Sequence, residues 1–529
     1  SAQAVSLTST VGPLTLGGNI GNATDNLTLI ATAGNIVGGA GTLTANNLTL
    51  TAAGGIGAGT AVRVNPAATL TLTTVGAGAA GDINVLATGA GPLNTANVVL
   101  NTDASTQSVT LAATNVILVG GNIGNAADHL TLTAGTSING GAGVLTGNDV
   151  TLNAVSGIGN IGLAAPVNIG TVAGNLSATN TTSGDLYLAT GAITLGSAGV
   201  SLNQRNNGTL RVDSSGAIVI GGNLAVGGAT GAIELNATGT ITRTGGTLSA
   251  NGITLGGTGT TTAIGAGGAP IMVDPNGGAG TVSASATTGG VFLEQATGDL
   301  LTSRYSLNVA GVAQTISLAT TNGNITFDST ASFNANTAND NWVITAQGAN
   351  RNIVGGATLT GNDITLNATG GIGIGTAMQT SKTGNLSLTT ASAGAAGNIT
   401  LVEANALNTN TVTLVTDASA QTVSLTSTAG PLTLGGNIGN ATDSLSLTAT
   451  TGNIVGGAGT ATANNLTLAA TNGGIGIGTA VNTNTAGTLS LTTGGAAAAG
   501  NVSVVEANAF NTANVTLTTA ASAQAVSLT

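Results

Sequence analysis

This chain of 529 residues contains no cysteine, and its proline, aromatic and charged residues are few. Without cysteine, neither disulfide bonds nor thiolate metal sites can form. Charged residues make up 5% of the chain, with 18 acids against 7 bases. This balance excludes the basic stripe on which nucleic-acid binding depends. No run of about 18 apolar residues occurs, so the sequence predicts no membrane-spanning helix.

Glycine and small or β-branched residues dominate what is present. The 86 glycines are accompanied by Thr, Ala, Asn, Ser, Leu, Val and Ile, and hydrophobic residues make up 41% of the chain. So many aliphatic and so few charged side chains argue against disorder. Collagen is excluded as well, because no Gly-X-Y triplet runs through the chain. This composition is typical of many short β-strands joined by tight corners.

One eight-residue segment marks a long repeat. SAQAVSLT occupies residues 1–8 and again 522–529, and looser versions begin at residues 105, 206, 312 and 419. The starts are about 104 residues apart, so we expect one continuous structure of five repeats and the start of a sixth. The predicted boundaries are 1–104, 105–205, 206–311, 312–418, 419–521 and 522–529. Because the two ends match, we expect a segment of a longer fibre, cut in register, whose true termini lie elsewhere.

A shorter period of about 21 residues lies inside each repeat. In LTLIATAGNIVGGAGTLTAN, Leu27 and Leu29 alternate with polar neighbours, as in a strand with one buried face. Two further short strands follow between glycine-rich corners, and Leu48 and Leu50 then begin the next coil directly over Leu27 and Leu29. We therefore predict an all-β fold, a parallel β-helix (β-solenoid) with about three short strands per coil and roughly 25 coils. At about 4.8 Å per coil, this stack would be on the order of 120 Å long.

Several coils resemble a known family. LTLTAAGGIGAG (48–59), LTLTAGTSINGGAG (130–143) and ITLNATGGIGIG (364–375) are similar to coils of the filamentous-haemagglutinin-like proteins. These are large bacterial adhesins exported by two-partner secretion, and autotransporter passenger domains are similar. The resemblance implies a right-handed parallel β-helix on or beyond the outer membrane, acting in adhesion, biofilm or matrix. The family's secretion domain is not recognisable here, and residues 1–30 lack the segments of a signal peptide, so we expect the export signal outside this sequence.

The single histidine is the first candidate for chemistry. His129 stands where other repeats carry Asn26 or Ser444, so we interpret it as a solvated turn residue. A Ser-His-Asp arrangement is the alternative, but no G-x-S-x-G motif accompanies it. We predict no catalytic residue.

Recurring aspartates are the second candidate. Asp25, Asp128 and Asp443 share one position of the repeat, and we interpret them as Asx-type turns or strand caps. Calcium binding is the alternative. GGAGTLTAN (38–46) has the glycines of a calcium-binding nonapeptide but lacks its aspartate, and no coil concentrates the acids that calcium needs. We predict neither a metal site nor a cofactor site.

The middle of the chain departs most from the repeat. Residues 205–342 hold 11 of the 25 charged residues (18 acids and 7 bases), and most of the aromatic residues lie between Tyr187 and Trp342. One interpretation is drift in a tolerant spacer. The other is a ligand-facing patch with Arg304, Tyr305 and Trp342 as contacts, because aromatic and arginine side chains dominate recognition surfaces.

The sequence therefore predicts an extracellular structural or adhesive fibre, and not an enzyme. Its expected location is the bacterial outer surface. Its expected partners are neighbouring copies of itself end to end, together with a host surface or a polysaccharide. The alternative is a rod that binds ice or a polysaccharide through outward Thr-x-Thr pairs, such as Thr49/Thr51 and Thr71/Thr73, or through the divergent middle.

Overall fold

The computed structural model describes residues 2–160, 162, 163, 165–311, 313–333, 337–509 and 511–529. The chain divides into two compact units, unit 1 (Ser1–Thr261) and unit 2 (Thr262–Thr529), which we describe separately. Short parallel strands stack as a β-solenoid of about 23 turns of roughly 23 residues, which confirms the predicted fold class. Residues 1 and 312, which begin the first and fourth predicted repeats, lie outside the described residues. The predicted repeat boundaries and the continuity of the five repeats stay predictions.

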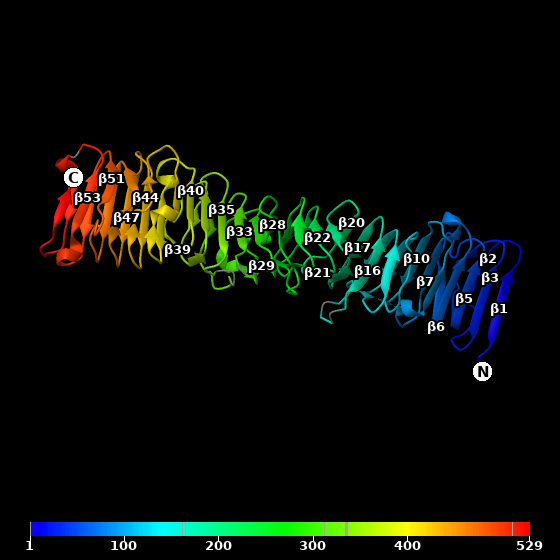
Figure 1. The fold of residues 1–529 in the computed structure, drawn as a ribbon. Coiled ribbons are helices and arrows are strands. Elements are labelled where there is room, and N and C mark those ends of the chain that lie inside the picture. The colour runs from blue at the N-terminus through cyan, green and yellow to red at the C-terminus, as the bar shows by residue number, and fades with distance from the viewer. Residues whose placement is uncertain (1, 161, 164, 312, 334–336, 510) are drawn as a thin grey trace. The chain divides into compact units, whose positions relative to one another are not determined.

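The first full turn of unit 1 shows how three strands close a coil. It consists of β3 (Asn26–Ala31), β4 (Ile36–Val37) and the first part of β5 (Thr42–Ala52), whose second part begins the next turn (Figure 1). Leu27 pairs with Leu48 and Leu29 with Leu50, which confirms the predicted register. Each strand therefore satisfies its backbone groups with the strands of the turns before and after it.

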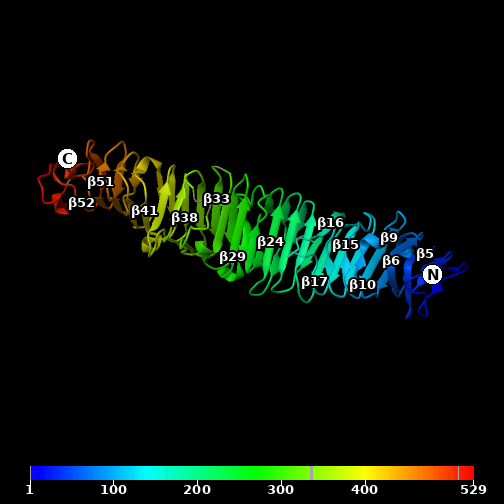
Figure 2. The same ribbon diagram turned by 90° about the horizontal axis from the view of Figure 1, so that it is seen from below.

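Alternation along each strand builds the core. In β3, Leu27 and Leu29 are buried, while Thr28 between them is partly exposed. Unit 2 repeats this arrangement in β47 (Ser444–Ala449), where Leu445 and Leu447 are buried. Each buried leucine contributes about 1.5–3 kcal/mol by transfer from water. Columns of aliphatic side chains therefore hold successive turns together. Figure 2 shows the stacked strands that carry them.

The corners require glycine where the backbone of the next turn passes close by. Gly57 has a φ of 79°, and a Cβ atom at this position would lie 2.1 Å from the carbonyl oxygen of Asn84. Gly373 of unit 2 has a φ of 70°, and its Cβ would lie 2.0 Å from the carbonyl oxygen of Thr400. Only glycine combines the left-handed conformation with this close approach.

One strand of each repeat spans two faces of the solenoid. In β7 (Ile83–Ala87), Ile83 pairs with Ile56, whereas Val85 pairs with Val62 of β6 (Val62–Thr74), which lies on the next face. In the next turn, β10 (Ser108–Ala113) pairs along the whole of β7. We call β7 a hand-over strand, because the strands that follow it lie one face away from the equivalent strands of the repeat before it.

The hand-over strand recurs in both units. Its equivalents are β18 (Leu186–Thr190) in unit 1 and, in unit 2, β30 (Val291–Gln295), β41 (Ile399–Glu403) and β53 (Val502–Glu506). As a result, β1 (Ala4–Ser9) and β10, which carry the same repeat segment, lie on different faces of unit 1. Sequence periodicity did not predict this displacement.

The hand-over also explains why the predicted count of 25 coils was too high. Leu27 pairs with Leu48, but Leu70 pairs with Val98, because the 3-10 turn η1 (Gly78–Gly81) and β7 lie between them. Turns that contain a hand-over strand are therefore longer than the predicted 21 residues. Helical segments of the described chain are short 3-10 turns, and none is long and apolar enough to cross a membrane.

Candidate functional site

The recurring aspartates cap strands of neighbouring turns. Asp128 Oδ1 accepts a hydrogen bond from the backbone N–H of Gln107 (3.0 Å), and its Oδ2 accepts from Asn125 Nδ2 (2.7 Å) and Thr102 Oγ1 (2.8 Å). Asp443, three repeats later, has the equivalent partners: the N–H of Gln421 (3.0 Å), Asn440 Nδ2 (2.7 Å) and Thr416 Oγ1 (2.8 Å). These contacts confirm the predicted turn and cap role. Each carboxylate oxygen is engaged by a protein donor.

A buried glutamine accompanies each of these caps. Gln107 Nε2 donates to the carbonyl oxygen of Gly76 (2.7 Å) and to Asp103 Oδ1 (2.8 Å), while its Oε1 accepts from Thr74 Oγ1 (3.1 Å). Gln421 of unit 2 makes the equivalent contacts, and both side chains are buried. At Gln107 and Gln421 the segment that marks the repeat is therefore a structural clamp, which joins the hand-over turn to the next strand. We call this network the glutamine clamp.

His129 lies at the start of β12 (His129–Ala134), where 40% of its side chain is exposed. Its Nδ1 lies 2.6 Å from Oδ2 of Asp149 on the next turn. A hydrogen bond from the backbone N–H of Asn175, together with the neighbouring His129 imidazole, holds the pKa of Asp149 below its ordinary value, although burial opposes this. The pair joins two adjacent strands at the surface. His129 is therefore partly exposed, as interpreted from the sequence, but it belongs to a strand and not to a turn.

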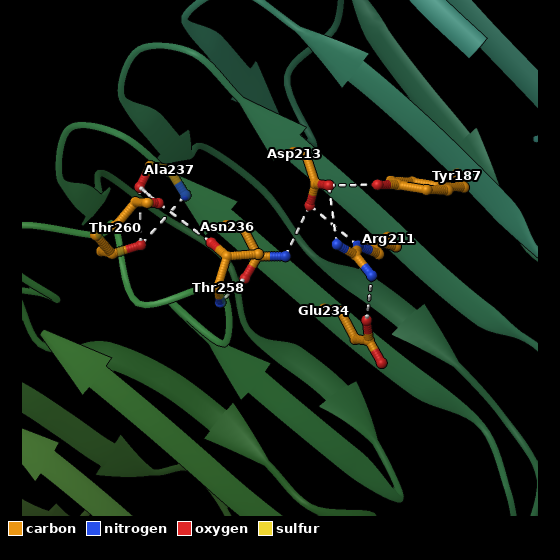
Figure 3. Close-up of polar contacts among 9 residues, drawn as sticks. Tyr187, Arg211, Asp213, Glu234, Asn236, Ala237, Thr258 and Thr260 are labelled. Carbon is orange, nitrogen blue, oxygen red and sulfur yellow. Dashed lines mark hydrogen bonds and ion pairs between the residues drawn. The ribbon is translucent and has the colours of Figure 1, made fainter. Parts of the chain in front are cut away.

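A cluster of polar and charged side chains lies on three neighbouring strands of unit 1 (Figure 3). Tyr187 of β18, Arg211 of β21 (Thr209–Ser214) and Glu234 of β24 (Ala232–Ala237) stand side by side in register. Asp213 and Asn236 form a second row on the same face. We call these five residues the charged ladder.

Asp213 is the centre of the charged ladder. Arg211 grips its two oxygens with Nε and Nη2, both at 3.0 Å, and stacks over the ring of Tyr187 at 4.6 Å. Tyr187 donates to Asp213 Oδ2 (2.5 Å), and Asn236 Nδ2 donates to Oδ1 (2.7 Å). Glu234 adds a longer ion pair to Arg211 Nη1 (3.7 Å).

The environment of the charged ladder lowers the pKa of Asp213 and raises the pKa of Tyr187. Burial would raise the pKa of Asp213, but the hydrogen bonds from Arg211, Tyr187 and Asn236 outweigh it and lower the pKa. Burial and the bond to Asp213 raise the pKa of Tyr187 to about 12. Each oxygen of Asp213 accepts two donors, so the carboxylate has no lone pair left to act as a general base. The charged ladder therefore ties three turns together.

Unit 2 contains a buried carboxylate of a second kind. Glu403, at the end of the hand-over strand β41, accepts hydrogen bonds from Thr380 Oγ1 (2.8 Å) and from the backbone N–H groups of Lys382 and Asn405 (both 3.1 Å). Burial raises the pKa of Glu403 above its ordinary value, and these bonds oppose the shift only in part. Burial also lowers the pKa of Lys382, whose Nζ donates to Thr411 Oγ1 and to the carbonyl oxygen of Gly384 (both 2.8 Å).

The predicted ligand contacts of the divergent middle lie mostly in the core of unit 2. Tyr305 is 1% exposed and donates to Gln295 Oε1 (2.8 Å). Trp342 is also 1% exposed, and Gly361 leaves room for its indole, which donates to the carbonyl oxygen of Thr360 (3.0 Å). This burial contradicts the predicted ligand contact of both aromatic residues.

Arg304 differs from the two aromatic residues because it is partly exposed. It ends η4 (Thr302–Arg304), and its guanidinium donates to the carbonyl oxygen of Gly278. Its role in ligand binding stays a prediction. Tyr305 and Trp342 belong to β32 (Tyr305–Val309) and β35 (Asn341–Ala346), which lie in different sheets, so the three residues do not form one patch.

The predicted threonine array is present on the outer face of unit 1. Thr28, Thr49 and Thr71 pair in one row, and Thr51 and Thr73 pair in the next. Neighbouring strands lie about 4.8 Å apart, and successive outward residues of one strand lie about 6.6 Å apart. The threonine hydroxyls therefore form a grid of two rows. Ile30 interrupts the second row, as the sequence indicates.

Sequence reasoning missed the charged ladder and the buried Glu403. Tyr187, Arg211 and Glu234 come from three different turns, and no local motif connects them. The glutamines of the SAQ segment were a signal that could have been used, because an amide repeated at one position implies a repeated partner. Among the described residues, no group of three or more His, Cys, Asp or Glu could hold a metal ion. No protein-family model, curated protein or solved structure matches the chain.

Proposed function

We propose that the chain is a segment of an extracellular structural fibre at the bacterial outer surface, acting in adhesion, biofilm or matrix. The observation that carries this proposal is the identical junction between successive repeats. In unit 2, β44 (Thr422–Ser427) pairs with the hand-over strand β41, and β55 (Val526–Leu528) pairs in the same way with β53. A repeat can therefore follow another without any new kind of contact, which is what an extendable fibre needs.

Two further features support a structural role. The glutamine clamp and the charged ladder consist of side chains whose polar groups bond to one another across turns. The resemblance of the coils to filamentous-haemagglutinin-like adhesins points to the same kind of function and to export. Adhesion would then belong to the fibre's surface, with neighbouring copies end to end and a host surface or polysaccharide as partners.

Fibre diffraction and imaging of the purified chain test the structural part of this proposal. We expect a meridional reflection near 4.8 Å, the separation of stacked strands, from concentrated and aligned protein. Light scattering should show concentration-dependent end-to-end assembly. A chain that stays monomeric at every concentration would contradict the proposed partner.

Immunogold labelling of intact cells of the source organism tests the location. Antibody raised against residues 1–529 should label the outer surface, and external protease should remove the label. Labelling only after the cells are broken would contradict an extracellular fibre.

The threonine grid favours a second candidate function, binding of ice or a polysaccharide. Thr28, Thr49 and Thr71 stand in register, so their hydroxyls offer a regular array to an ordered ligand. Thermal hysteresis of the purified chain tests ice binding, with a Thr49→Val/Thr71→Val double variant as the comparison. Absence of hysteresis at high protein concentration would exclude ice as the ligand.

A further inference from the structure

A cavity of about 360 Å³ opens on the surface of unit 1. The loop 55–59 forms one wall, and the outer face of β7 and β10 forms the other. Asp82, Asn84, Ser108 and Thr110 provide the polar side chains of this second wall. The volume lies at the small end of the range for ligand pockets, which is about 300–1,000 Å³.

The cavity exists because one side chain is small. Ala58 lies in its loop wall, and the equivalent loops of unit 2 carry Ile374 and Ile477 at this position. In those loops the isoleucine folds back over the glycine three residues earlier. Its Cδ1 comes within 2.5 Å of the place where a Cβ of Gly371 would lie, and within 2.7 Å in the case of Gly474. Ala58 leaves this space open.

The three loops share one backbone conformation. Gly57 and Gly59 both have a φ of 79°, while Gly373 and Gly375 have 70° and 80°. The loop around Ile477 repeats this pair of left-handed glycines. The open cavity therefore results from the side chain at position 58 and not from a different loop fold, and an isoleucine fits this backbone.

The second wall, which we call the polar wall, carries hydrogen-bonding groups that can bind a ligand. Thr110 lies directly opposite Asn84 on the neighbouring strand, and Asp82 Oδ1 accepts from the N–H of Ser108 (2.8 Å). Among the described residues, the other oxygen of Asp82, the amide of Asn84 and the hydroxyls of Ser108 and Thr110 have no hydrogen-bond partner. The four side chains form a grid of about 4.8 by 6.6 Å, which suits a single ring with several hydroxyl groups.

Charge narrows the class of ligand. Among the described residues that line the cavity, Asp82 is the only charged one, and no arginine, lysine or histidine accompanies it. A carboxylate accepts hydrogen bonds from hydroxyl groups, whereas it repels an anionic ligand. The wall therefore favours a neutral ligand over a uronate or a phosphate.

We propose that this cavity binds one ring of a neutral saccharide, with Asp82 and Asn84 bonding its hydroxyl groups. The site goes beyond the structural role proposed above and does not depend on it. The described residues that line the cavity include no aromatic side chain, so the ring is held by hydrogen bonds without stacking. We expect a dissociation constant in the millimolar range, as for a small ligand with few contacts (about 1 mM).

Saturation-transfer NMR on the full chain tests this proposal, with methyl glycosides of glucose, galactose and mannose as probes. At least one probe should receive saturation from the wild-type chain. Ala58→Ile should abolish the signal, because it restores the side chain that fills the equivalent space in unit 2. Asn84→Ala, which does not fill the cavity, should weaken binding by at least about fivefold through the loss of a hydrogen bond.

A matched control separates the cavity from a general surface effect. Ala90→Ile makes the same substitution at an exposed position of the same repeat outside the cavity, and it should leave the signal unchanged. Glucuronate should bind less than the neutral probes to the wild type, and Asp82→Asn should remove this preference. Asparagine already occupies the equivalent position at Asn398, so the variant should fold.

The proposal fails under any of three results. No signal with any of the three neutral probes at about 20 mM, well above the expected dissociation constant, would overturn it. Equal signals for the wild type and Ala58→Ile would place binding elsewhere. Unchanged binding in both Asn84→Ala and Asp82→Asn would show that the polar wall does not contact the ligand.

Discussion

Buried amide and carboxyl side chains decide how the turns of this protein join at their corners. Gln107 and Gln421 make the same three contacts in different repeats, so one residue type performs one task at one position. Glu403 accepts hydrogen bonds from the backbone N–H groups of Lys382 and Asn405 and from the hydroxyl of Thr380, and Thr380 and Lys382 are buried. Removing one such side chain leaves several polar groups unsatisfied at once.

Gln421→Ala should destabilise unit 2 by about 1–3 kcal/mol, because Ser392 O and Thr390 Oγ1 lose their partner and Asp417 Oδ1 loses one of its three donors. Chemical denaturation gives the change in the free energy of unfolding, and hydrogen exchange should show faster opening around residues 390–421. Gln3, the equivalent residue of the first repeat, is exposed. Gln3→Ala is therefore the control and should change stability little. An equal loss in both variants would contradict the clamp.

Glu403 should make stability depend on pH. Burial raises its folded pKa above the ordinary value of 4.5, so the folded state binds the proton more tightly than the unfolded state. This contribution is fully present below the unfolded pKa and is lost as the pH rises through the folded pKa. Glu403→Gln removes the titration, so the variant should gain stability relative to the wild type between pH 4 and pH 7.

Denaturation of both proteins at pH 4 and pH 7 checks this prediction. Glutamine suits the site, because Gln295 ends the hand-over strand β30 at the equivalent position and is 2% exposed. A difference in unfolding free energy that stays constant across this pH range would show that Glu403 titrates normally.

At the scale of the strand, stability comes from columns of aliphatic side chains that cross several turns. Leu447 of β47 is 0% exposed and pairs with Leu425 on one side and Leu468 on the other. Each residue of a column therefore contributes to two interfaces. The outward residues between them contact solvent and contribute far less.

Leu447→Ala should cost about 2–5 kcal/mol, because the cavity it leaves cannot close without moving both neighbouring strands. The loss should appear in denaturant unfolding and as faster hydrogen exchange in β44 and in β50 (Asn465–Ala470). Thr448→Ala, on the outer face of the same strand, should stay within about 0.5 kcal/mol of the wild type. Similar losses in both variants would contradict the assignment of inner and outer faces.

At the scale of the whole molecule, the repeat is defined by its hand-over strand. Within unit 2 the junctions β41–β44 and β53–β55 have the same register, so a complete repeat lies between them. Stability of such a chain is close to the sum of its repeats and their interfaces. Whole repeats should therefore be removable, whereas fractions of a repeat should not.

Deletion of residues 419–521 joins Ala418 to Ser522 and restores the sequence of the natural junction. The shortened chain should keep its β-sheet circular dichroism per residue and its midpoint of thermal unfolding within a few degrees. Its denaturant m-value should fall in proportion to the surface removed. Deletion of residues 419–470 removes about half a repeat and brings a glycine loop against β41, so its midpoint should fall clearly. Equal behaviour of the two deletions would contradict the repeat as the structural unit.

Prediction from the sequence succeeded where the cause is local. Alternation around Leu27 and Leu29, with the same pattern at Leu48 and Leu50, was enough for the fold class and the register of the first turns. It failed for Tyr305 and Trp342, because large aromatic side chains are as common at recognition surfaces as in cores, and only Gly361 and the neighbouring turns show that the indole is enclosed. Only the structure shows that Arg304, unlike the two aromatic residues, is partly exposed.

The sequence by itself determined that this protein is a stack of short parallel strands with aliphatic columns inside, since strand alternation and a regular repeat act through nearest neighbours along the chain. The tertiary structure alone decided the hand-over strands, the charged ladder, the burial of Glu403 and the open cavity at Ala58. Each of these depends on which residues of different turns come together, and that meeting is set by the number of residues in every intervening corner.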